Sequence, residues 1–285
     1  MRKALTILLV FLVVLNIQPV PAAGNEAESS YDHIMRTGTI RCAYLLYTPY
    51  FVRDVSTGEM SGVFHDIMEE IGKSIGLKVE WVMEVGYDNI FPGLDSGQYD
   101  VFAGGLWPNS KRARAGYFTL PAFYSVVTAW GRKDETRFKN LEGINDPFVR
   151  VSTVDGAIAD VIAQTDYPKA TIVSLPNLTP YSMTFQNIID NKADITFVDA
   201  SVAQDFLRTH PGAIQQIAPD KPLRVFGNSL VVRRGNIDLK LLLDTAMQEL
   251  VYSGRIDKIL QKYEKQPSPF KRLIQPYFSS PQVKN

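Results

Sequence analysis

Hydrophobic positions along the chain recur alternately with the period of a strand and with that of a helix. A strand is predicted over residues 39–44, and apolar residues then follow at helical spacing over residues 63–75. Residues 78–83 alternate as a strand does, a short helix is expected over 89–94, and a buried strand over 99–103. This βαβαβ order predicts a parallel sheet with helices on both faces.

A second alternation of the same kind begins at residue 150. Its expected elements are a strand over 150–154, a helix over 156–164, a strand over 171–175, a helix over 180–190 and a strand over 195–198. Asp199 and a further helix follow directly. The chain therefore contains two α/β units in succession.

Two apolar segments, at residues 124–131 and 223–232, lie between and after these units. Each is long enough to cross from one unit to the other. We therefore expect an α/β protein of two lobes, each a mostly parallel sheet flanked by helices, joined by two crossing strands that act as hinges. The expected first lobe holds residues 37–127 and 226–265, and the second holds residues 128–225.

The C-terminal part begins with a strongly amphipathic helix over residues 239–251, which resumes after Gly254 and ends near residue 263. Residues 266–285 form an extension that contains four prolines from Pro267 onwards. We expect an extended arm or a partly disordered end there.

The first 22 residues have the layout of a secretory signal peptide. Arg2 and Lys3 precede an apolar run over residues 5–17, and small residues follow at 20–22. The run is shorter than the roughly 20 apolar residues of a membrane-spanning helix. No cysteine lies near Ala22 to accept a lipid. We expect residues 1–22 to be cleaved and the mature chain to be soluble, in the periplasm if the cell is Gram-negative.

Charge and composition exclude several classes of function. Lys plus Arg and Asp plus Glu both number 30, so no net charge attracts nucleic acid or an anionic membrane. Cys42 is the single cysteine, and we expect a buried structural thiol. His33, His65 and His210 lack metal-ligand spacing, and the common nucleophile and nucleotide-binding motifs are absent. We expect a monomer that has no metal, no cofactor and no enzymatic activity.

Residues 109–123 contain the clearest candidate chemistry. Arg112 and Arg114 follow the glycine turn at residues 103–105 and lie six and four residues before Phe118 in an expected strand. The planar guanidinium group matches the geometry of a carboxylate. An arginine held between a glycine turn and a strand is therefore a candidate carboxylate clamp.

Several short segments, taken in order, resemble the bacterial extracellular solute-binding proteins of family 3, the amino-acid receptors of ABC importers. The resemblance covers residues 40–263, and it rests on segments 47–51, 62–67, 87–94, 97–101, 109–123 and 191–199. It implies the two-lobed periplasmic-binding-protein fold, with lobes that close on a small zwitterionic ligand. It also implies an ABC importer permease in the inner membrane as partner.

The resemblance implies a role for each matching residue. Arg112 matches the carboxylate clamp, and Asp199 matches the aspartate that pairs with the ligand ammonium. An aspartate before a helix also serves as an ordinary N-cap, and both roles can coexist. Tyr87 and Tyr47 match the rings that enclose the ligand.

Four positions need separate comment. Gly156 and Ala157 start a helix directly after a strand, so their amides are candidates for the second carboxylate oxygen. Ala157 replaces the hydroxyl residue usual in the family, and Trp107 replaces a small hydroxyl residue that commonly accepts the ammonium. Gly105 can still offer its carbonyl.

Three functions remain open from the sequence. The first is a receptor for an amino acid. The second is a receptor for another small metabolite, such as an organic acid, or an accessory protein of a periplasmic oxidation system, which the residues Ala157 and Trp107 favour. The third is a periplasmic cyclohexadienyl or arogenate dehydratase, which resembles the same fold and would use a carboxylate in the cleft as general acid.

Overall fold

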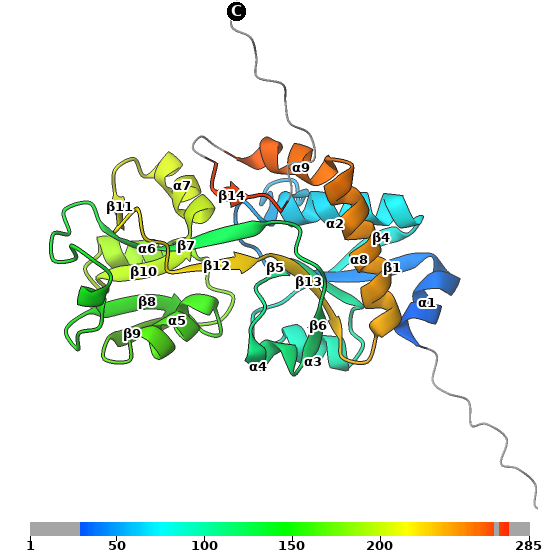
Figure 1. Cartoon of the computed structure of the whole chain (residues 1–285), viewed down its shortest axis with the longest axis horizontal. Coiled ribbons are helices and arrows are strands. Elements are labelled where there is room, and N and C mark those ends of the chain that lie inside the picture. The colour runs from blue at the N-terminus through cyan, green and yellow to red at the C-terminus, as the bar shows by residue number, and fades with distance from the viewer. Residues whose placement is uncertain (1–28, 265–267, 274–285) are drawn as a thin grey trace, which may run out of the picture.

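The computed structural model describes residues 29–264 and 268–273. Two separate sheets lie side by side, each covered by helices, and two segments of the chain cross between them (Figure 1). The predicted α/β fold of two lobes is confirmed. The predicted signal peptide, residues 1–22, lies outside the described residues.

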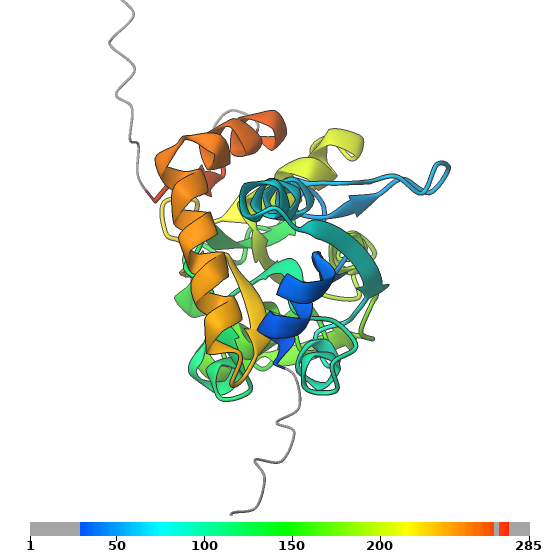
Figure 2. The same ribbon diagram turned by 90° about the vertical axis from the view of Figure 1, so that its right-hand side faces the viewer.

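The first sheet has five strands in the order β4 (Lys78–Glu84), β1 (Thr39–Tyr44), β5 (Val101–Leu106), β13 (Ser229–Arg233) and β6 (Gly116–Phe118). Strands β4, β1 and β5 are parallel, and β13 runs antiparallel to both β5 and β6. A small hairpin of β2 (Val52–Arg53) and β3 (Met60–Ser61) projects from this lobe (Figure 2).

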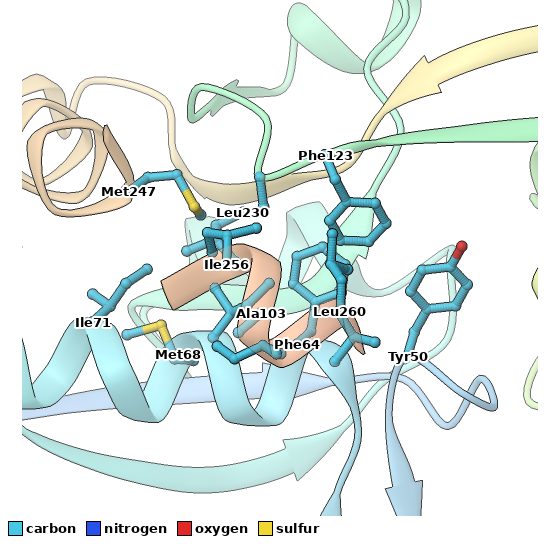
Figure 3. Packing of buried hydrophobic residues seen from close by; sticks show 14 of the residues in the cluster. Tyr50, Phe64, Met68, Ile71, Ala103, Phe123, Leu230, Met247, Ile256 and Leu260 are labelled. Atoms are coloured by element: carbon cyan, nitrogen blue, oxygen red, sulfur yellow. The ribbon is translucent and has the colours of Figure 1, made fainter. Parts of the chain in front are cut away.

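Helices cover both faces of the first sheet. They are α1 (Ser30–Thr37), α2 (Val63–Ile75), α3 (Ile90–Asp95), α4 (Ser110–Ala113), α8 (Ile237–Tyr252) and α9 (Arg255–Tyr263). The apolar residues of α2 that recur at helical spacing face the sheet, where Phe64, Met68 and Ile71 pack with Met247 and Leu260 from α8 and α9 (Figure 3). The helical periodicity of the sequence is thus the period of a buried face. Cys42 is buried in the same cluster, as predicted.

The second sheet is built around β7 (Tyr124–Arg132). Its strand order is β11 (Ile214–Ile217), β7, β10 (Ile195–Asp199), β8 (Arg150–Val154) and β9 (Thr171–Leu175). Its helices are α5 (Ile158–Asp166), α6 (Ser182–Ile189), α7 (Ala200–Thr209) and the short 3-10 helix η1 (Glu142–Ile144). Strands β8, β9 and β10 are parallel, and β7 pairs with β10 in the antiparallel direction.

Each sheet is stabilised by the same kind of contact, between an aspartate that precedes a buried strand and an arginine of the neighbouring strand. Asp100 precedes β5 and accepts hydrogen bonds from the backbone amide of Arg41 at 2.9 Å and from its guanidinium at 2.7 Å. Asp194 precedes β10 and binds the amide of Arg150 at 2.8 Å, and it also pairs with Arg137 at 2.7 Å. These contacts explain why both lobes carry an aspartate just before a buried strand.

The chain crosses between the lobes in both predicted segments. Strand β7 leaves the first lobe, and β12 (Arg224–Gly227) pairs with it on the way back before Asn228 leads into β13. A third strand, β14 (Phe270–Lys271), also pairs with β7 at Tyr124 and Ser125 (Figure 1). The described part of the C-terminal extension therefore docks on a hinge strand. Among the described residues, no helix combines the length and apolar character needed to span a membrane.

Candidate functional site

A small pocket lies where the two lobes meet. Six of the eight predicted site residues line it, namely Arg112, Tyr87, Tyr47, Gly105, Trp107 and Ala157, whereas Gly156 and Asp199 do not. The cavity measures ≈ 30 Å³, room for about two water molecules. Residues of both lobes form its wall, among them Arg112 of the first lobe and Ala157 of the second.

Arg112 lies in α4, the short helix after β5. The side chain of Asn109 caps this helix by accepting the amide of Arg112 at 2.9 Å. The guanidinium donates to the carbonyl of Trp107 at 2.9 Å and, across the interface, to the carbonyl of Gly156 at 3.0 Å. Its central carbon lies 5.8 Å from the centre of the Tyr87 ring. The predicted clamp is thus held at the junction of the lobes.

Arg112 has no acidic partner among the described residues. Burial lowers the pKa of Arg112 because it disfavours the charged form, and the neighbouring Tyr87 acts in the opposite direction. Arg114, the alternative clamp, is exposed. A half-buried cation that meets only neutral carbonyl groups can gain a counter-charge from an anionic ligand group.

Four tyrosines, Tyr47, Tyr50, Tyr87 and Tyr181, contribute to the aromatic part of the pocket wall. Tyr47, in the loop after β1, meets Tyr181 edge-on with ring centres 5.2 Å apart. The hydroxyl of Tyr181 donates to the carbonyl of Phe197 at 3.0 Å. Burial raises the pKa of Tyr87 to about 12, and it raises the pKa of Tyr181 further. These phenols therefore stay protonated at neutral pH. Tyr181 was not predicted, because its position at the start of a helix gave no signal.

The turn into α5 differs from the expectation. Gly156 has a φ of 75°, which favours glycine. The amide of Ala157 donates to the carbonyl of Val154 at 2.9 Å, and the helix begins only at Ile158. The amide of Ala157 is therefore occupied. Within the described residues, the amides of Ile158 and Ala159 have no hydrogen-bond acceptor, as expected of the first turn of a helix.

Trp107 forms a fixed wall of the pocket. Its indole N–H donates to Oδ1 of Asn228 at 2.8 Å, and its ring stacks on Phe226 with centres 5.0 Å apart. The single indole donor is thus already used by Asn228, and the Trp107 side chain offers the pocket an aromatic face and no acceptor. Asn228 also lines the pocket. Asn228 lies in a crossing segment predicted from the sequence, but its contact with Trp107 was not predicted.

Asp199 ends β10 and is completely buried. Its Oδ1 accepts the amide of Ser201 at 2.9 Å and the hydroxyl of Ser201 at 2.8 Å, which confirms the predicted N-cap. Its Oδ2 accepts the hydroxyl of Tyr50 at 2.6 Å. Burial raises the pKa of Asp199, although hydrogen bonds from Ser125, Tyr50 and Ser201 act against this rise. The structure therefore places this carboxylate behind Tyr50 and outside the pocket lining.

Two curated proteins show what this sequence is similar to. Over 198 residues, 68% of this chain and 71% of the relative, it is 29% identical to a cyclohexadienyl dehydratase of Pseudomonas aeruginosa. Over 273 residues, 93% of this chain and 99% of the relative, it is 26% identical to a probable histidine-binding protein of Campylobacter jejuni.

A solved structure shows the same fold. An ancestral amino acid-binding protein, described as a precursor of cyclohexadienyl dehydratase, superimposes with a TM-score of 0.74 at 25% identity, over 84% of this chain and 100% of that one. The model of the bacterial extracellular solute-binding proteins, family 3, matches residues 40–266. The chain belongs to this family of extracellular solute-binding proteins.

Proposed function

We propose that this chain is a periplasmic receptor that captures an amino acid or a closely related small solute between two closing lobes and delivers it to an ABC importer. Membership of an extracellular solute-binding family supports the secreted location. The similarity to a histidine-binding protein and to an ancestral amino acid-binding protein supports the class of solute.

One observation carries this proposal. Arg112 reaches the pocket between the lobes with a guanidinium that meets only carbonyl groups. A ligand carboxylate can take two parallel hydrogen bonds from this fork and supply the missing negative charge. Ile158, the first residue of α5, lines the pocket from the second lobe, and the N-terminus of a helix favours an anion through the helix dipole. Tyr47, Tyr87 and Trp107 enclose the rest of the solute.

The proposal is tested by a thermal-shift screen of the twenty amino acids and common organic acids. A solute that binds only the folded protein raises the melting temperature. For a solute found in this way, Arg112→Lys should weaken binding at least fivefold, about 1 kcal/mol, because an ammonium cannot reproduce the guanidinium fork. Arg114→Lys, two residues away and exposed, is the matched control and should change little.

Two results would contradict the proposal. One is the absence of any stabilising acid in the screen, and the other is equal binding by the wild type and the Arg112→Lys variant. Delivery to an importer is tested separately, by the uptake of the same labelled solute into cells with and without the gene.

A dehydratase is the second candidate, because a cyclohexadienyl dehydratase is 29% identical over 198 residues. Among the residues that the structure describes, the pocket lacks the general acid that a dehydratase needs. Within the described residues the pocket lining contains no carboxylic acid, histidine or lysine, and Asp199 is covered by Tyr50. Incubation with a cyclohexadienyl substrate, followed by the absorbance of an aromatic product, distinguishes the two functions.

A further inference from the structure

One hydrogen bond joins the two lobes beneath the pocket. The hydroxyl of Tyr50, in the loop before β2, donates to Oδ2 of Asp199 at the end of β10 at 2.6 Å. The other carboxylate oxygen already accepts two hydrogen bonds from Ser201. The protein itself therefore supplies hydrogen-bond donors to both oxygens of Asp199, so this carboxylate is satisfied without a ligand.

The ring of Tyr50 is fixed by its packing. It is 2% exposed and stacks on Tyr47 at 5.5 Å and on Phe123 at 6.0 Å between ring centres. Phe64 lies at 6.2 Å, and Phe270 of β14 closes the remaining side at 6.1 Å. The hydroxyl points away from the apolar cluster to which the ring belongs (Figure 3). Moving this ring aside would break a packed aromatic cluster and is costly.

The same hydroxyl is tied to both hinge strands. Ser125 of β7 lies 2.7 Å from it, and Asn228, directly after β12, donates to Ser125 at 2.8 Å. The network thus runs from the pocket wall at Trp107 through Asn228, Ser125 and Tyr50 to Asp199. Every side chain in this hydrogen-bond network has its partners within the protein.

An ammonium group in the pocket would find only weak partners. Among the described residues the lining contains no carboxylate, and the Trp107 side chain has no acceptor, since its one polar group donates to Asn228. What remains is neutral acceptors, such as backbone carbonyls of the glycine turn, and the faces of the tyrosine rings. Burying a cation without an anion costs several kcal/mol.

We propose that Tyr50 takes the place of the ligand cation at Asp199, so that this aspartate holds the lobes together and does not bind the solute. The site then selects its ligand by a carboxylate and an apolar or aromatic body. Carboxylic acids that lack an α-amino group bind at least as well as the corresponding amino acids. This inference rests on the proposed function, since it keeps the capture of a carboxylate by Arg112.

Matched pairs of acids test the inference by calorimetry on the full mature chain. Suitable pairs are L-phenylalanine with 3-phenylpropionate, L-leucine with 4-methylpentanoate, and L-histidine with 3-(imidazol-4-yl)propionate. For every pair that binds, the acid without an amino group should bind within threefold of the amino acid, or more tightly. An amino acid that binds at least tenfold more tightly than its partner overturns the inference and leaves the proposed receptor intact. If no member of any pair binds, and no organic acid in the screen binds, both the inference and the proposed receptor function are wrong.

A variant separates the role of Asp199 from a general effect on folding. In Asp199→Asn the ratio of the two affinities of a pair should stay within threefold of the wild-type ratio. A loss of affinity common to both members cancels in this ratio. If Asp199 instead pairs with the ammonium, the amino acid alone loses affinity, tenfold or more, and the inference is wrong. Asparagine is also a good N-cap, so α7 should form in the variant.

Discussion

The docking of the C-terminal strand on the hinge gives a prediction that can be worked out from the structure. Phe270 of β14 is 3% exposed, and its ring meets Phe123 edge-on at 5.3 Å and Tyr50 at 6.1 Å between centres. Phe270 itself pairs with Ser125 of β7 in the antiparallel direction. The substitution Phe270→Ala should therefore remove a packed ring from behind the residue that binds Asp199.

The magnitude follows from the buried area. A phenylalanine side chain removes about 150 Å² from water, which at about 25 cal/mol per Å² stabilises the fold by about 4 kcal/mol. The unfolded chain already buries part of this area, so we expect Phe270→Ala to lower the free energy of unfolding by about 3 kcal/mol. For a chain of this size the melting temperature should fall by about 6–12 °C.

Urea unfolding followed by circular dichroism measures this change, and the next residue provides the control. Lys271 is exposed, so Lys271→Ala should alter the free energy of unfolding by less than about 0.5 kcal/mol. A loss below about 1 kcal/mol in Phe270→Ala, or an equal loss in both variants, would show that the strand does not dock on the hinge in solution.

Two further predictions concern the lobes. Burial alone would raise the pKa of Asp194, but hydrogen bonds from Arg150 and Arg137 lower it overall, so its contribution is present at pH 7 and is lost as the pH falls through the lowered pKa. Asp194→Asn should cost about 2–4 kcal/mol at pH 7 and less near pH 3, as measured by denaturant unfolding at both pH values. A Cβ added at Gly86 would lie 2.3 Å from Oδ1 of Asn177 in the other lobe. Gly86→Ala should therefore hinder closure of the lobes and weaken the binding of a solute found in the screen about fivefold or more. A second substitution, Asn177→Ala, should restore the affinity. If the double variant binds no better than Gly86→Ala, the explanation is wrong.

The sequence predicted the fold well, because the fold depends on patterns that are local. The strand over 150–154 matches β8 residue for residue, and the apolar face of α2 was identified by its spacing. The two crossing segments were predicted because they are apolar, lie between and after the two α/β units, and are long enough to connect them. Strand β14 was missed, since two residues in a proline-rich segment carry no periodic signal.

The candidate site was predicted only in part. Arg112, Tyr47 and Tyr87 line the pocket, as predicted. They could be predicted because the turns and strands that hold them are recognisable from local sequence. The partner of Asp199 could not be predicted in this way. Tyr50 lies 149 positions away along the chain, and only the closed packing of the two lobes brings its hydroxyl to the carboxylate.

The two charged residues expected at an amino-acid site, Arg112 and Asp199, have opposite surroundings in the fold. Arg112 keeps its charge at the pocket and meets only carbonyl groups, whereas the charge of Asp199 is turned away from the pocket and satisfied by hydroxyl and amide donors. Within residues 29–264 and 268–273, the pocket lining therefore carries one positive charge, that of Arg112, and no negative charge. Because a buried charge is stabilised only when a partner meets it, a monoanion complements this pocket better than a zwitterion does. The sequence departures at Ala157 and Trp107 act in the same direction, since each removes a hydroxyl group from the surroundings of the ligand.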